Sequence, residues 1–449
     1  MALSGIEIFK QLPKTNCGDC GVPTCLAFAM KLAQGQAELA ACPHISDEAK
    51  AALASAAAPP MRAVTVGKGD AAFTVGEETV VFRHDRTFVN PCAIGVSVDA
   101  SAADEGIDAV VAQAEAASFE RVQQHLACGF VAVRGDGDAA RYKAAVERVM
   151  SKTSLPLVLM TEDAAEAGAA LESAAAAGRP LLCAATAANA DAMIELAKRH
   201  SCPLVVRGDG LAEVAALTAK AKAAGVEDLV IDSAPKTAGA ALRDAVFARR
   251  CALVKKFAEL GYPTICFPCD LAGGDAMLET AYAAVDVAKY GSIIVLSGAE
   301  PWRMLPLLVL RQNIFTDPQR PMQAESKIYA INDPGPEAPF LVTTNFSLTY
   351  FIVSSEIEGG RMPAYLGIVD AEGLSVLTAW AAGKFVPERI AKFVKDTGIA
   401  ETVSHREIII PGAVAQISGE LAEELDGWTV TVGPYEAAEL PAFLKRRAG

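Results

Sequence analysis

Eight short apolar runs, spread evenly between residues 92 and 300, constrain the fold of this 449-residue chain more than any other feature. Each run is followed by a polar turn and then by a helical pattern such as "AARYKAAVERVMSK". Buried strands that alternate with helices predict a parallel sheet covered on both faces. Eight such units favour a TIM barrel, and the alternative is an open doubly wound sheet. The runs begin at Cys92, Gly129, Leu155, Pro180, Pro203, Asp228, Pro263 and Ser292.

The rest of the chain divides around the barrel, which we place at residues 92–325. Residues 326–449 carry four further strand patterns, "FLVTTN", "YLGIVD", "EIIIPG" and "TVTVGP", with helical patterns between them. This alternation predicts a small, open, Rossmann-like α/β domain. Residues 1–58 form a separate N-terminal domain, and residues 59–91 form a linker with a small hairpin. The fold class is therefore a multidomain α/β protein.

Composition and charge exclude several classes of function. The net charge of −14 argues against nucleic acid as a partner, because phosphate binding needs stripes of Lys and Arg, and it disfavours anionic membrane surfaces. No segment reaches about 18 consecutive apolar residues, and the first residues lack the pattern of a signal peptide. We therefore expect a cytoplasmic protein whose eleven cysteines stay reduced rather than forming a disulfide framework.

Four cysteines near the N-terminus predict a metal site. Cys17, Cys20, Cys25 and Cys42 follow the spacing C-x2-C-x4-C-x16-C, within which Gly18 permits a tight loop. Four thiolates suit either a structural zinc ion or a 4Fe-4S cluster. Zinc sites usually pair two short knuckles, whereas this chain has one knuckle and a distant cysteine followed by proline. The pattern favours the 4Fe-4S cluster, and a purely structural role for the thiols is the remaining alternative.

The predicted barrel has its own candidate groups. Cys266 and Cys269 form another C-x2-C pair, for which core packing is a better explanation than metal binding. Charged residues also follow the strands, where barrel active sites lie, and could act as general bases or metal ligands. Acids at such positions are common helix N-caps, which is the interpretation we favour. These residues are Asp99, Arg134, Glu162, Asp163, Arg207, Asp209, Asp232 and Asp270.

The C-terminal domain offers a second kind of site. Ligands of open α/β domains bind outside the carboxyl ends of the strands. In this chain those ends carry small and hydroxyl-bearing residues at positions 343–345, 370–378, 411–413 and 433–434. A broad ligand could approach such backbone closely, but ordinary turns have the same composition, and the residues alone leave both readings open.

A family resemblance narrows these alternatives. "NCGDCGVPTCLAFAMKLAQG" with "ACP" resembles the N-terminal cluster domain of the large (gamma) subunits of the corrinoid iron–sulfur protein, the methyl carrier of the reductive acetyl-CoA (Wood–Ljungdahl) pathway. The resemblance continues through "AAAPP", "ATAANADAM", "RQNIFTDPQRP", "VTTNFSLTY", "DAEGLSVLTAWAAGKF" and "IIIPGAVA". It covers essentially the whole chain, in the order of the three domains.

The resemblance implies a function for each end of the chain. The C-terminal domain carries a cobalamin-type corrinoid, whose Co(I) state takes a methyl group from methyltetrahydrofolate on a separate methyltransferase and passes it to acetyl-CoA synthase/CO dehydrogenase. The 4Fe-4S cluster returns inactive Co(II) to Co(I). A small subunit completes a heterodimer, and the barrel is a scaffold. The protein is then a methyl-transfer carrier, enzymatic only in the sense that its cofactor is methylated and demethylated.

The same resemblance implies the site residues. The four cysteines hold the cluster. Thr378 is the candidate catalytic residue, nearest the reactive face of the cobalt, where its hydroxyl could hold a water or limit access. The implied corrinoid contacts are Thr344, Tyr350, Gly373, Leu374, Ser375, Val376, Leu377, Thr378, Gly412, Ala413, Gly433 and Ala437.

The histidines bear on the state of the cobalt. Many corrinoid carriers ligate cobalt through a D-x-H-x-x-G loop, and none of the five histidines of this chain lies in that motif. Without an axial nitrogen, Co(II) is easier to reduce, so we expect a base-off, His-off corrinoid. Two other functions stay open: a pterin-class barrel enzyme with an appended electron-transfer cluster, and an electron-transfer module without methyl chemistry.

Overall fold

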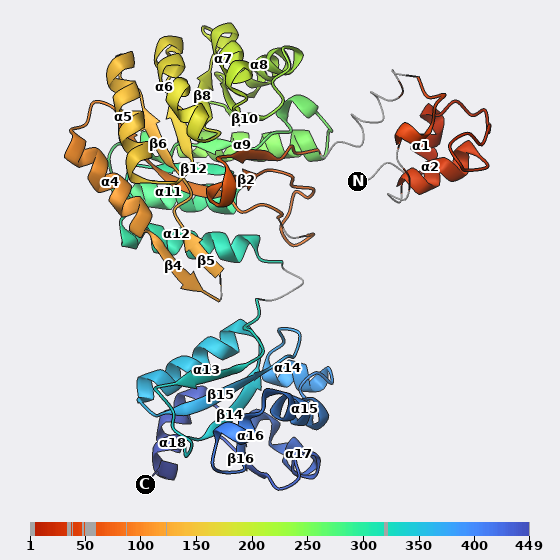
Figure 1. Ribbon diagram of the computed structural model, residues 1–449, viewed down its shortest axis with the longest axis vertical. Helices are drawn as coiled ribbons and strands as arrows, with labels where there is room; N and C mark the ends of the chain where they lie inside the picture. The colour runs from red at the N-terminus through yellow and green to blue at the C-terminus, as the bar shows by residue number, and fades with distance from the viewer. Residues whose placement is uncertain are drawn as a thin grey trace. The chain divides into compact units, whose positions relative to one another are not determined.

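The structure is a computed structural model that describes residues 5–33, 37, 39–46, 49, 60–86, 88–122, 124–317 and 322–448. The chain divides into two compact units (Figure 1). The first comprises residues 1–117 and 128–315, and the second comprises residues 118–127 and 316–449. The predicted boundary between residues 58 and 59 lies outside the described residues. No helix of the described part is long and apolar enough to cross a membrane.

The N-terminal segment of the first unit is a small helical module. Helix α1 (Gly5–Gln11) packs on α2 (Cys25–Ala33), and a short turn of 3-10 helix, η1 (Leu39–Ala41), follows. Phe28 and Ala29 of α2 are fully buried in a core that also contains the side chains of Cys25 and Cys42. Two of the predicted cluster cysteines, Cys25 and Cys42, are therefore part of the module's own hydrophobic core, Cys20 packs against it, and Cys17 is exposed.

The eight predicted barrel strands all form, and they pair in sequence order in one parallel sheet. A parallel bridge between Ile231 and Thr264 joins the sixth strand to the residue before the seventh, so the sheet closes on itself. The prediction of a barrel is confirmed, and the open doubly wound alternative is excluded. The strands are β3 (Ala93–Asp99), β6 (Val131–Arg134), β7 (Leu157–Met160), β8 (Leu181–Ala185), β9 (Leu204–Arg207), β10 (Leu229–Asp232), β11 (Ile265–Cys266) and β12 (Ile293–Leu296).

Helices surround the barrel, and a hairpin seals one end. In the 59–91 segment, β1 (Val64–Val66) and β2 (Phe73–Val75), which flank η2 (Gly69–Ala71), form the small hairpin that was expected. Its valines join the core inside the barrel. It lies at the amino-terminal end, because Gly67 donates a hydrogen bond to the carbonyl of Arg179, which precedes β8. The helices are α4 (Asp104–Ala116), α5 (Ala139–Lys152), α6 (Ala164–Ala177), α7 (Ala190–His200), α8 (Leu211–Ala223), α9 (Ala238–Leu253), η3 (Ala258–Leu260), α10 (Pro268–Leu271), α11 (Ala276–Ala288) and α12 (Pro301–Phe315).

The second unit is an open five-stranded sheet with the order β13-β15-β14-β16-β17. The four predicted strands are parallel: β14 (Phe340–Thr344), β15 (Ala364–Val369), β16 (Glu407–Ile410) and β17 (Thr429–Val432). The antiparallel edge strand β13 (Ile328–Ile331) was not predicted. The hairpin of β4 (Ser118–Arg121) and β5 (Gln124–Ala127) also groups with this unit, although its residues fall in the predicted barrel range.

Helices cover both faces of this sheet. Ile357 and Leu444 form a core on one face, and Ile390 and Phe393 form a core on the other. Because β14 is flanked by β15 and β16, the chain leaves β14 toward one side and later returns on the other, which creates a switch point at the carboxyl ends. The helices are α13 (Ser347–Gly360), α14 (Val376–Ala381), α15 (Pro387–Thr397), α16 (Ile399–Thr402), η4 (Gly412–Ile417), α17 (Ser418–Glu424), η5 (Ala437–Glu439) and α18 (Leu440–Ala448).

Candidate functional site

Hydrogen bonds shape the cysteine loop before any metal binds. The side-chain oxygen of Asn16 accepts from the backbone N–H of Cys25 (2.8 Å), and the N–H of Asn16 points at the Cys25 sulfur (3.4 Å). Gly18 and Gly21 both have positive φ angles, of 81° and 76°, which a residue with a side chain rarely adopts. The expected tight glycine loop is therefore present, with one backbone donor already directed at a sulfur.

The spacing of the sulfurs bears on the kind of metal. Zinc holds thiolates at about 2.3 Å, so sulfurs that share one ion lie roughly 4 Å apart. In the described residues, the only trio of potential metal ligands within 4.8 Å of one another is Cys17, Asp19 and His44. No three of the four cysteine sulfurs gather that closely. Thiolates that bind different irons of a cluster need no such close approach.

Asp19 and His44 form an exposed ion pair that the sequence analysis missed. His44 Nε2 lies 2.5 Å from Asp19 Oδ2. The hydrogen bond from His44, and a second from Cys17, hold the pKa of the Asp19 carboxyl below its usual range. The pair joins the loop of the first three cysteines to the turn that follows Cys42.

The second unit has a cavity at the carboxyl ends of its strands. It measures about 190 Å³ and lies between the ends of β14, β16 and β17 and helices α13 and α18. The side chain of Thr343 lines it, is 2% exposed, and has no hydrogen-bond partner for its hydroxyl among the described residues. The neighbouring Thr344 hydroxyl is likewise buried without a partner in the described part of the chain. Unsatisfied buried hydroxyls are costly, so this end of β14 is suited to a ligand.

Asn345 organises the loop that follows β15. Its side-chain oxygen accepts from the N–H groups of Ala371 (3.0 Å) and Gly373 (2.9 Å), and its amide donates to Asp370 (2.9 Å). Gly373 adopts a φ angle of 75°, which favours glycine. One buried amide thus holds the backbone of a segment that resemblance assigns to corrinoid contacts. The sequence analysis placed Asn345 at a strand end but missed this role.

Two predicted glycines meet at the ends of β16 and β17. A Cβ atom at Gly412 would lie 2.7 Å from the carbonyl oxygen of Gly433, which is shorter than real contacts allow. The N–H of Gly412 donates to the carbonyl of Pro434 (3.0 Å). Glycine is therefore required at position 412 by the close approach of the two turns.

The structure brings only some of the predicted corrinoid contacts together around the cavity. Val376, Ala413, Gly433 and Ala437 line it. The ring of Tyr350 instead packs against Tyr329, with centroids 4.8 Å apart. The remaining predicted residues lie around the carboxyl ends of the strands of this sheet, which we call the carboxyl edge. They lie at the end of β14, in the loop after β15, in α14 and in the turn after β16: Thr344, Gly373, Leu374, Ser375, Leu377, Thr378 and Gly412.

Thr378 is exposed, as access to a ligand requires. It lies in the first turn of α14, and its hydroxyl is 3.0 Å from that of Ser375. The exposed side chains of Leu377 and Trp380 belong to the same short helix. The predicted position next to a reactive face remains a prediction.

The carboxyl edge also gathers the exposed large apolar side chains of this unit. The described part of this unit has six such side chains. They lie in the first turns of α13, in α14, at the end of β17 and in the turn that follows β17. Scattered apolar side chains are normal on a surface, but their collection at one edge is typical of a binding site. They are Leu348, Ile352, Leu377, Trp380, Val432 and Tyr435.

The histidine of residues 322–448 lies away from this edge. His405 is the only histidine in residues 322–448. It precedes β16 at the amino-terminal end, where its Nε2 lies 2.9 Å from the carbonyl of Ala338 and its Nδ1 accepts from the N–H of Glu407. Both ring nitrogens of His405 therefore interact with backbone groups near the start of β16.

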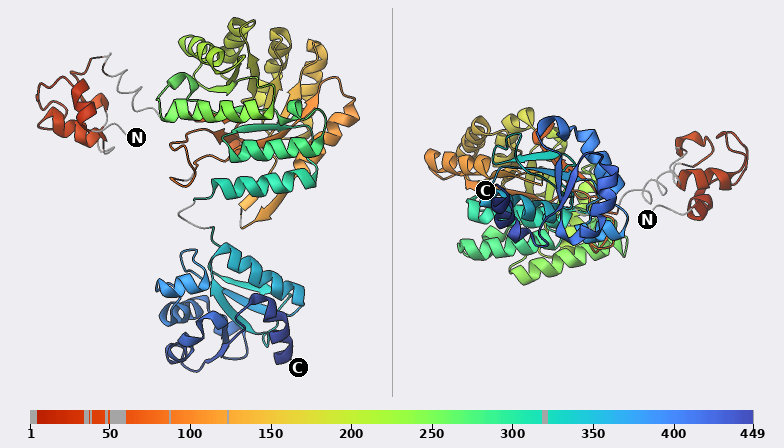
Figure 2. Two further views of the ribbon diagram at one scale, coloured as in Figure 1. Left: turned by 180° about the vertical axis from the view of Figure 1, so that it is seen from behind. Right: turned by 90° about the horizontal axis from the view of Figure 1, so that it is seen from below.

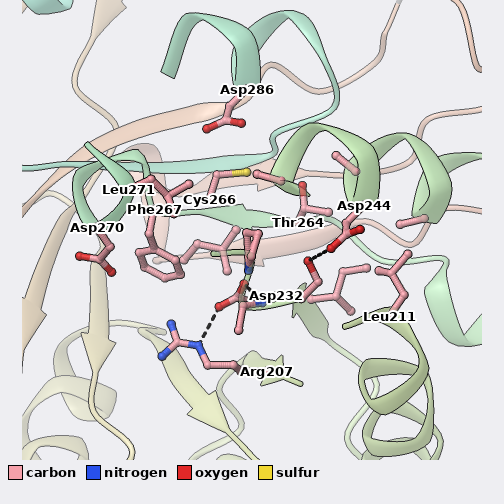
Figure 3. Close-up of a pocket in the computed structure, with 18 of the residues that line it drawn as sticks. Arg207, Leu211, Asp232, Asp244, Thr264, Cys266, Phe267, Asp270, Leu271 and Asp286 are labelled. Atoms are coloured by element: carbon pink, nitrogen blue, oxygen red, sulfur yellow. Dashed lines mark hydrogen bonds and ion pairs between the residues drawn. The ribbon is translucent and has the colours of Figure 1, made fainter. Parts of the chain in front are cut away.

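Two arginines form ion pairs with four of the acids at the carboxyl end of the barrel. Arg207 donates to Asp232 (2.7 Å) and Glu162 (2.8 Å), as Figure 3 shows for Asp232. Arg134 donates to Asp270 (2.8 Å) and lies 3.7 Å from a further acid, Asp99. The favoured interpretation of these acids as helix caps is wrong for the four that pair with arginine, because other residues hold the N-cap positions of the adjacent helices: Ala103, Asp163, Thr237 and Phe267.

Two other acids at the strand ends have local partners. Asp163 is a helix cap, since its side chain accepts from the N–H groups of Ala165 and Glu166 at the start of α6. For Asp163 the prediction is confirmed. It is wrong for Asp209, because Gly210 occupies the N-cap position of α8.

A cavity of about 420 Å³ lies beside Arg207, between β10, β11 and helices α9 and α11 (Figure 3). Asp286 of α11 lines it, and burial raises the pKa of this carboxyl to about 7. The Cys266 thiol also lines it, and burial raises its pKa. Cys269, whose pKa burial raises to about 12, contacts Asp270 and Arg134. Burial therefore keeps both thiols in the protonated form near neutral pH.

Comparison with known proteins defines the family. A sequence profile described as CO dehydrogenase/acetyl-CoA synthase delta subunit matches residues 63–444, and another, described as a putative Fe-S cluster, matches residues 12–44. The corrinoid/iron-sulfur protein large subunit of Moorella thermoacetica is 46% identical over 446 residues, with 99% of each chain covered. This chain belongs to the family of corrinoid/iron–sulfur protein large subunits.

Archaeal relatives are more distant members of this family. The acetyl-CoA decarbonylase/synthase complex subunit gamma of Methanopyrus kandleri is 33% identical over 455 residues, with 99% of this chain and 98% of the relative covered. Among solved structures, dihydropteroate synthase from Xanthomonas albilineans aligns with 51% of this chain and 98% of its own length at 17% identity. Its TM-score of 0.36 is too low to support a conclusion about fold or function.

Proposed function

We propose that this protein is the large subunit of a corrinoid-dependent methyl carrier. Its second unit holds a cobalt corrinoid, which takes a methyl group from methyltetrahydrofolate on a separate methyltransferase and delivers it to acetyl-CoA synthase/CO dehydrogenase. Its N-terminal module holds a 4Fe-4S cluster and supplies the electron that restores oxidised cobalt to the reactive state. The single observation that supports the proposal is the cavity with exposed apolar side chains around it at the carboxyl edge of the second unit, taken together with membership of the family.

The residues of the carboxyl edge fit a corrinoid. The ring system is broad and flat, with methyl groups and amide side chains at its rim. An edge with six exposed apolar side chains gives such a ring an apolar surface. The buried Thr343 hydroxyl, which has no hydrogen-bond partner among the described residues, gives a cofactor group inside the cavity a hydrogen-bonding partner. The loop held by Asn345 presents Ser375 and Thr378 beside that surface.

The position of His405 supports a base-off, His-off corrinoid. A histidine at the amino-terminal end of β16 is at the opposite end of the strand from the ligand edge. Axial ligands tune metal potentials, and the absence of a nitrogen ligand makes cobalt easier to reduce. This arrangement matches a carrier that a low-potential cluster reactivates.

The cysteine module fits a 4Fe-4S cluster better than a single zinc ion. Cys25 and Cys42 are buried in one small core that Cys20 contacts, Cys25 begins helix α2, and the N–H of Asn16 is directed at a sulfur. The positive end of a helix dipole stabilises negative charge, and N–H groups directed at sulfur tune cluster potentials.

A labelled-methyl transfer assay tests the proposal. The purified protein is loaded with corrinoid, reduced, and given methyltetrahydrofolate labelled in its methyl group. Protein-bound label should form only when the methyltransferase is added, and acetyl-CoA synthase should then remove it. Label that never binds would refute the carrier function. Turnover of methyltetrahydrofolate by this chain alone would instead identify a pterin-class barrel enzyme.

The same assay tests the cluster. A Cys17→Ser, Cys20→Ser variant should accept label once after chemical reduction, because its corrinoid edge is intact. After oxidation it should fail to recover with a protein electron donor that restores the wild type. Equal recovery in both proteins would refute a role of the cluster in reactivation.

A further inference from the structure

The cavity beside Arg207 exists because helix α9 presents small residues to the barrel sheet. Helices α9 and α11 lie side by side along the outside of the barrel (Figures 1 and 2). Ala241, Ala245 and Ala248 of α9 line the cavity, together with Ile231 of β10 and Ile265 of β11. Residues at these intervals share one helix face, so the face that lines this space carries only methyl groups there. Protein interiors are otherwise closely packed, and a volume of about 420 Å³ lies in the range of ligand sites.

The walls of the cavity suit a flat apolar ligand. Phe267 lines it, and the guanidinium of Arg207 lies over the Phe267 ring, 5.1 Å from the ring centroid (Figure 3). A cation above its face helps to hold an aromatic ring in place. Leu211 and Leu271 add further apolar atoms to the lining. A ring system that enters the cavity therefore meets apolar side chains from the barrel sheet and from several helices.

One acid of the lining has no cationic partner. Five acidic side chains line the cavity, and four of them accept hydrogen bonds from Arg207, Arg134 or Arg243. The fifth, Asp286 of α11, has no hydrogen bond or ion pair in the described part of the chain, and Figure 3 shows its carboxyl group directed toward Cys266. The four paired acids are Glu162, Asp232, Asp244 and Asp270.

The surroundings of Asp286 favour an organic cation over other ligands. Burial alone raises the pKa of this carboxyl to about 7, because no cation of the described residues lies close enough to offset it. Ionised Asp286 repels an anion, and a neutral ligand leaves the carboxylate unpaired. A metal ion needs several ligands together, and the only close trio in the described residues is that of Cys17, Asp19 and His44. A ligand that brings its own N–H donors and positive charge completes the site.

We propose that this cavity binds a small, flat organic cation, whose charged nitrogen donates a hydrogen bond to Asp286 while its ring fills the space beside the alanines of α9. Hydrogen bonds between a cationic N–H and a carboxylate are among the strongest in proteins. The site gives the barrel a ligand of its own. It does not rest on the proposed function, which makes the barrel a scaffold and assigns its cavity no ligand.

Calorimetry of the purified full-length chain with two matched compounds tests this site. Benzamidine is a flat cation, and benzamide is a neutral compound of almost the same shape. At pH 8, benzamidine should bind with a Kd of about 1 mM or tighter, and benzamide at least about tenfold more weakly. Asp286→Asn should weaken benzamidine binding by at least about tenfold. The control Asp108→Asn, which removes a partly buried acid of α4 outside the cavity, should bind benzamidine as the wild type does. Absence of benzamidine binding to the wild type, or equal binding of the two compounds, would overturn the proposal.

A second variant tests the place of binding. Ala245→Leu puts a larger side chain into the cavity and should weaken benzamidine binding by at least about tenfold. Ala216→Leu, on the exposed face of α8, is the matched control and should bind normally. Melting temperatures of all variants show that they are folded. Undiminished binding to Ala245→Leu would place the compound elsewhere and contradict the proposal.

The pH dependence of binding identifies the acid. The titratable neighbours of Asp286 are the thiols of Cys92 and Cys266, which burial keeps protonated because it raises the pKa of each. Affinity for benzamidine should therefore rise about tenfold between pH 6 and pH 8 as Asp286 ionises, and a flat profile would contradict the proposal. Iron and cobalt measured in the same samples test the proposed function separately, since their absence would overturn that function without affecting this site.

Discussion

Replacing Asn345 should loosen the loop between β15 and α14. In the Asn345→Ala variant, the N–H groups of Ala371 and Gly373 lose their common acceptor, and Asp370 and Gln323 lose a donor. A buried N–H left without a partner costs about 1–3 kcal/mol. Two of them give a loss of about 3 kcal/mol in the local stability of the loop, which is about a hundredfold in the equilibrium between closed and open states.

Amide hydrogen exchange measures this loss directly. Protection of residues 371–375 should fall about a hundredfold in Asn345→Ala, while protection of the barrel strands should stay unchanged. Corrinoid affinity should fall by at least about tenfold, because binding must then order the loop. Unchanged protection would refute the reasoning, since it would mean that the amide does not hold the loop.

A variant that introduces a negative charge at the same position provides the control. Asn345→Asp keeps the acceptor but places a carboxylate oxygen against Asp370, where the amide nitrogen now lies at 2.9 Å. At an effective dielectric constant of about 20, two carboxylates at this distance repel by up to about 6 kcal/mol, so the loop should open more at pH 8 than at pH 5. Adding Asp370→Asn restores one donor and should recover most of the protection. Failure of the double variant to improve on Asn345→Asp would show that the pair does not interact.

Three further outcomes are expected. Cys25→Ser should lower the iron content of purified protein, while Cys269→Ser should leave it unchanged; equal iron in both would place the cluster elsewhere. Gly412→Ala should destabilise the second unit by about 2 kcal/mol in denaturant unfolding, because its Cβ would lie 2.7 Å from a facing carbonyl oxygen, whereas Gly419→Ala meets nothing and should be tolerated. The pKa of Asp286 is raised to about 7. Native protein therefore binds more protons than unfolded protein between pH 4 and 7, and loses up to about 4 kcal/mol as pH rises through that window. Asp286→Asn should remove this loss in unfolding measured at pH 5 and pH 8, and an unchanged pH profile would contradict it.

The barrel could be predicted because its signal is repeated and local. Each apolar run encodes its own strand, so even the two-residue strand β11 was placed, and the count of eight then selected the fold. The edge strand β13 escaped because its residues are only partly buried and its pattern is short. The grouping of hairpin β4–β5 with the second unit depends on tertiary contacts that no local pattern reports.

The functional sites also divide into those that a local sequence pattern predicts and those that depend on tertiary contacts. The cysteine spacing is contained in one short segment and could be recognised from it. Arg134 and Asp270, by contrast, are far apart in sequence and meet only because the barrel closes. The role of Asn345 depends on the path of a loop that follows a different strand. Such features follow from the assembled fold rather than from motifs.

Metal analysis with an electronic spectrum tests the central claim most directly. The protein should be purified without oxygen after expression with its small subunit and corrinoid. We predict about four irons and about one cobalt per chain, with the absorption of a base-off corrinoid. Iron without cobalt, despite reconstitution with corrinoid, would contradict the carrier function and leave the cysteine module as an electron-transfer site on a barrel of another purpose.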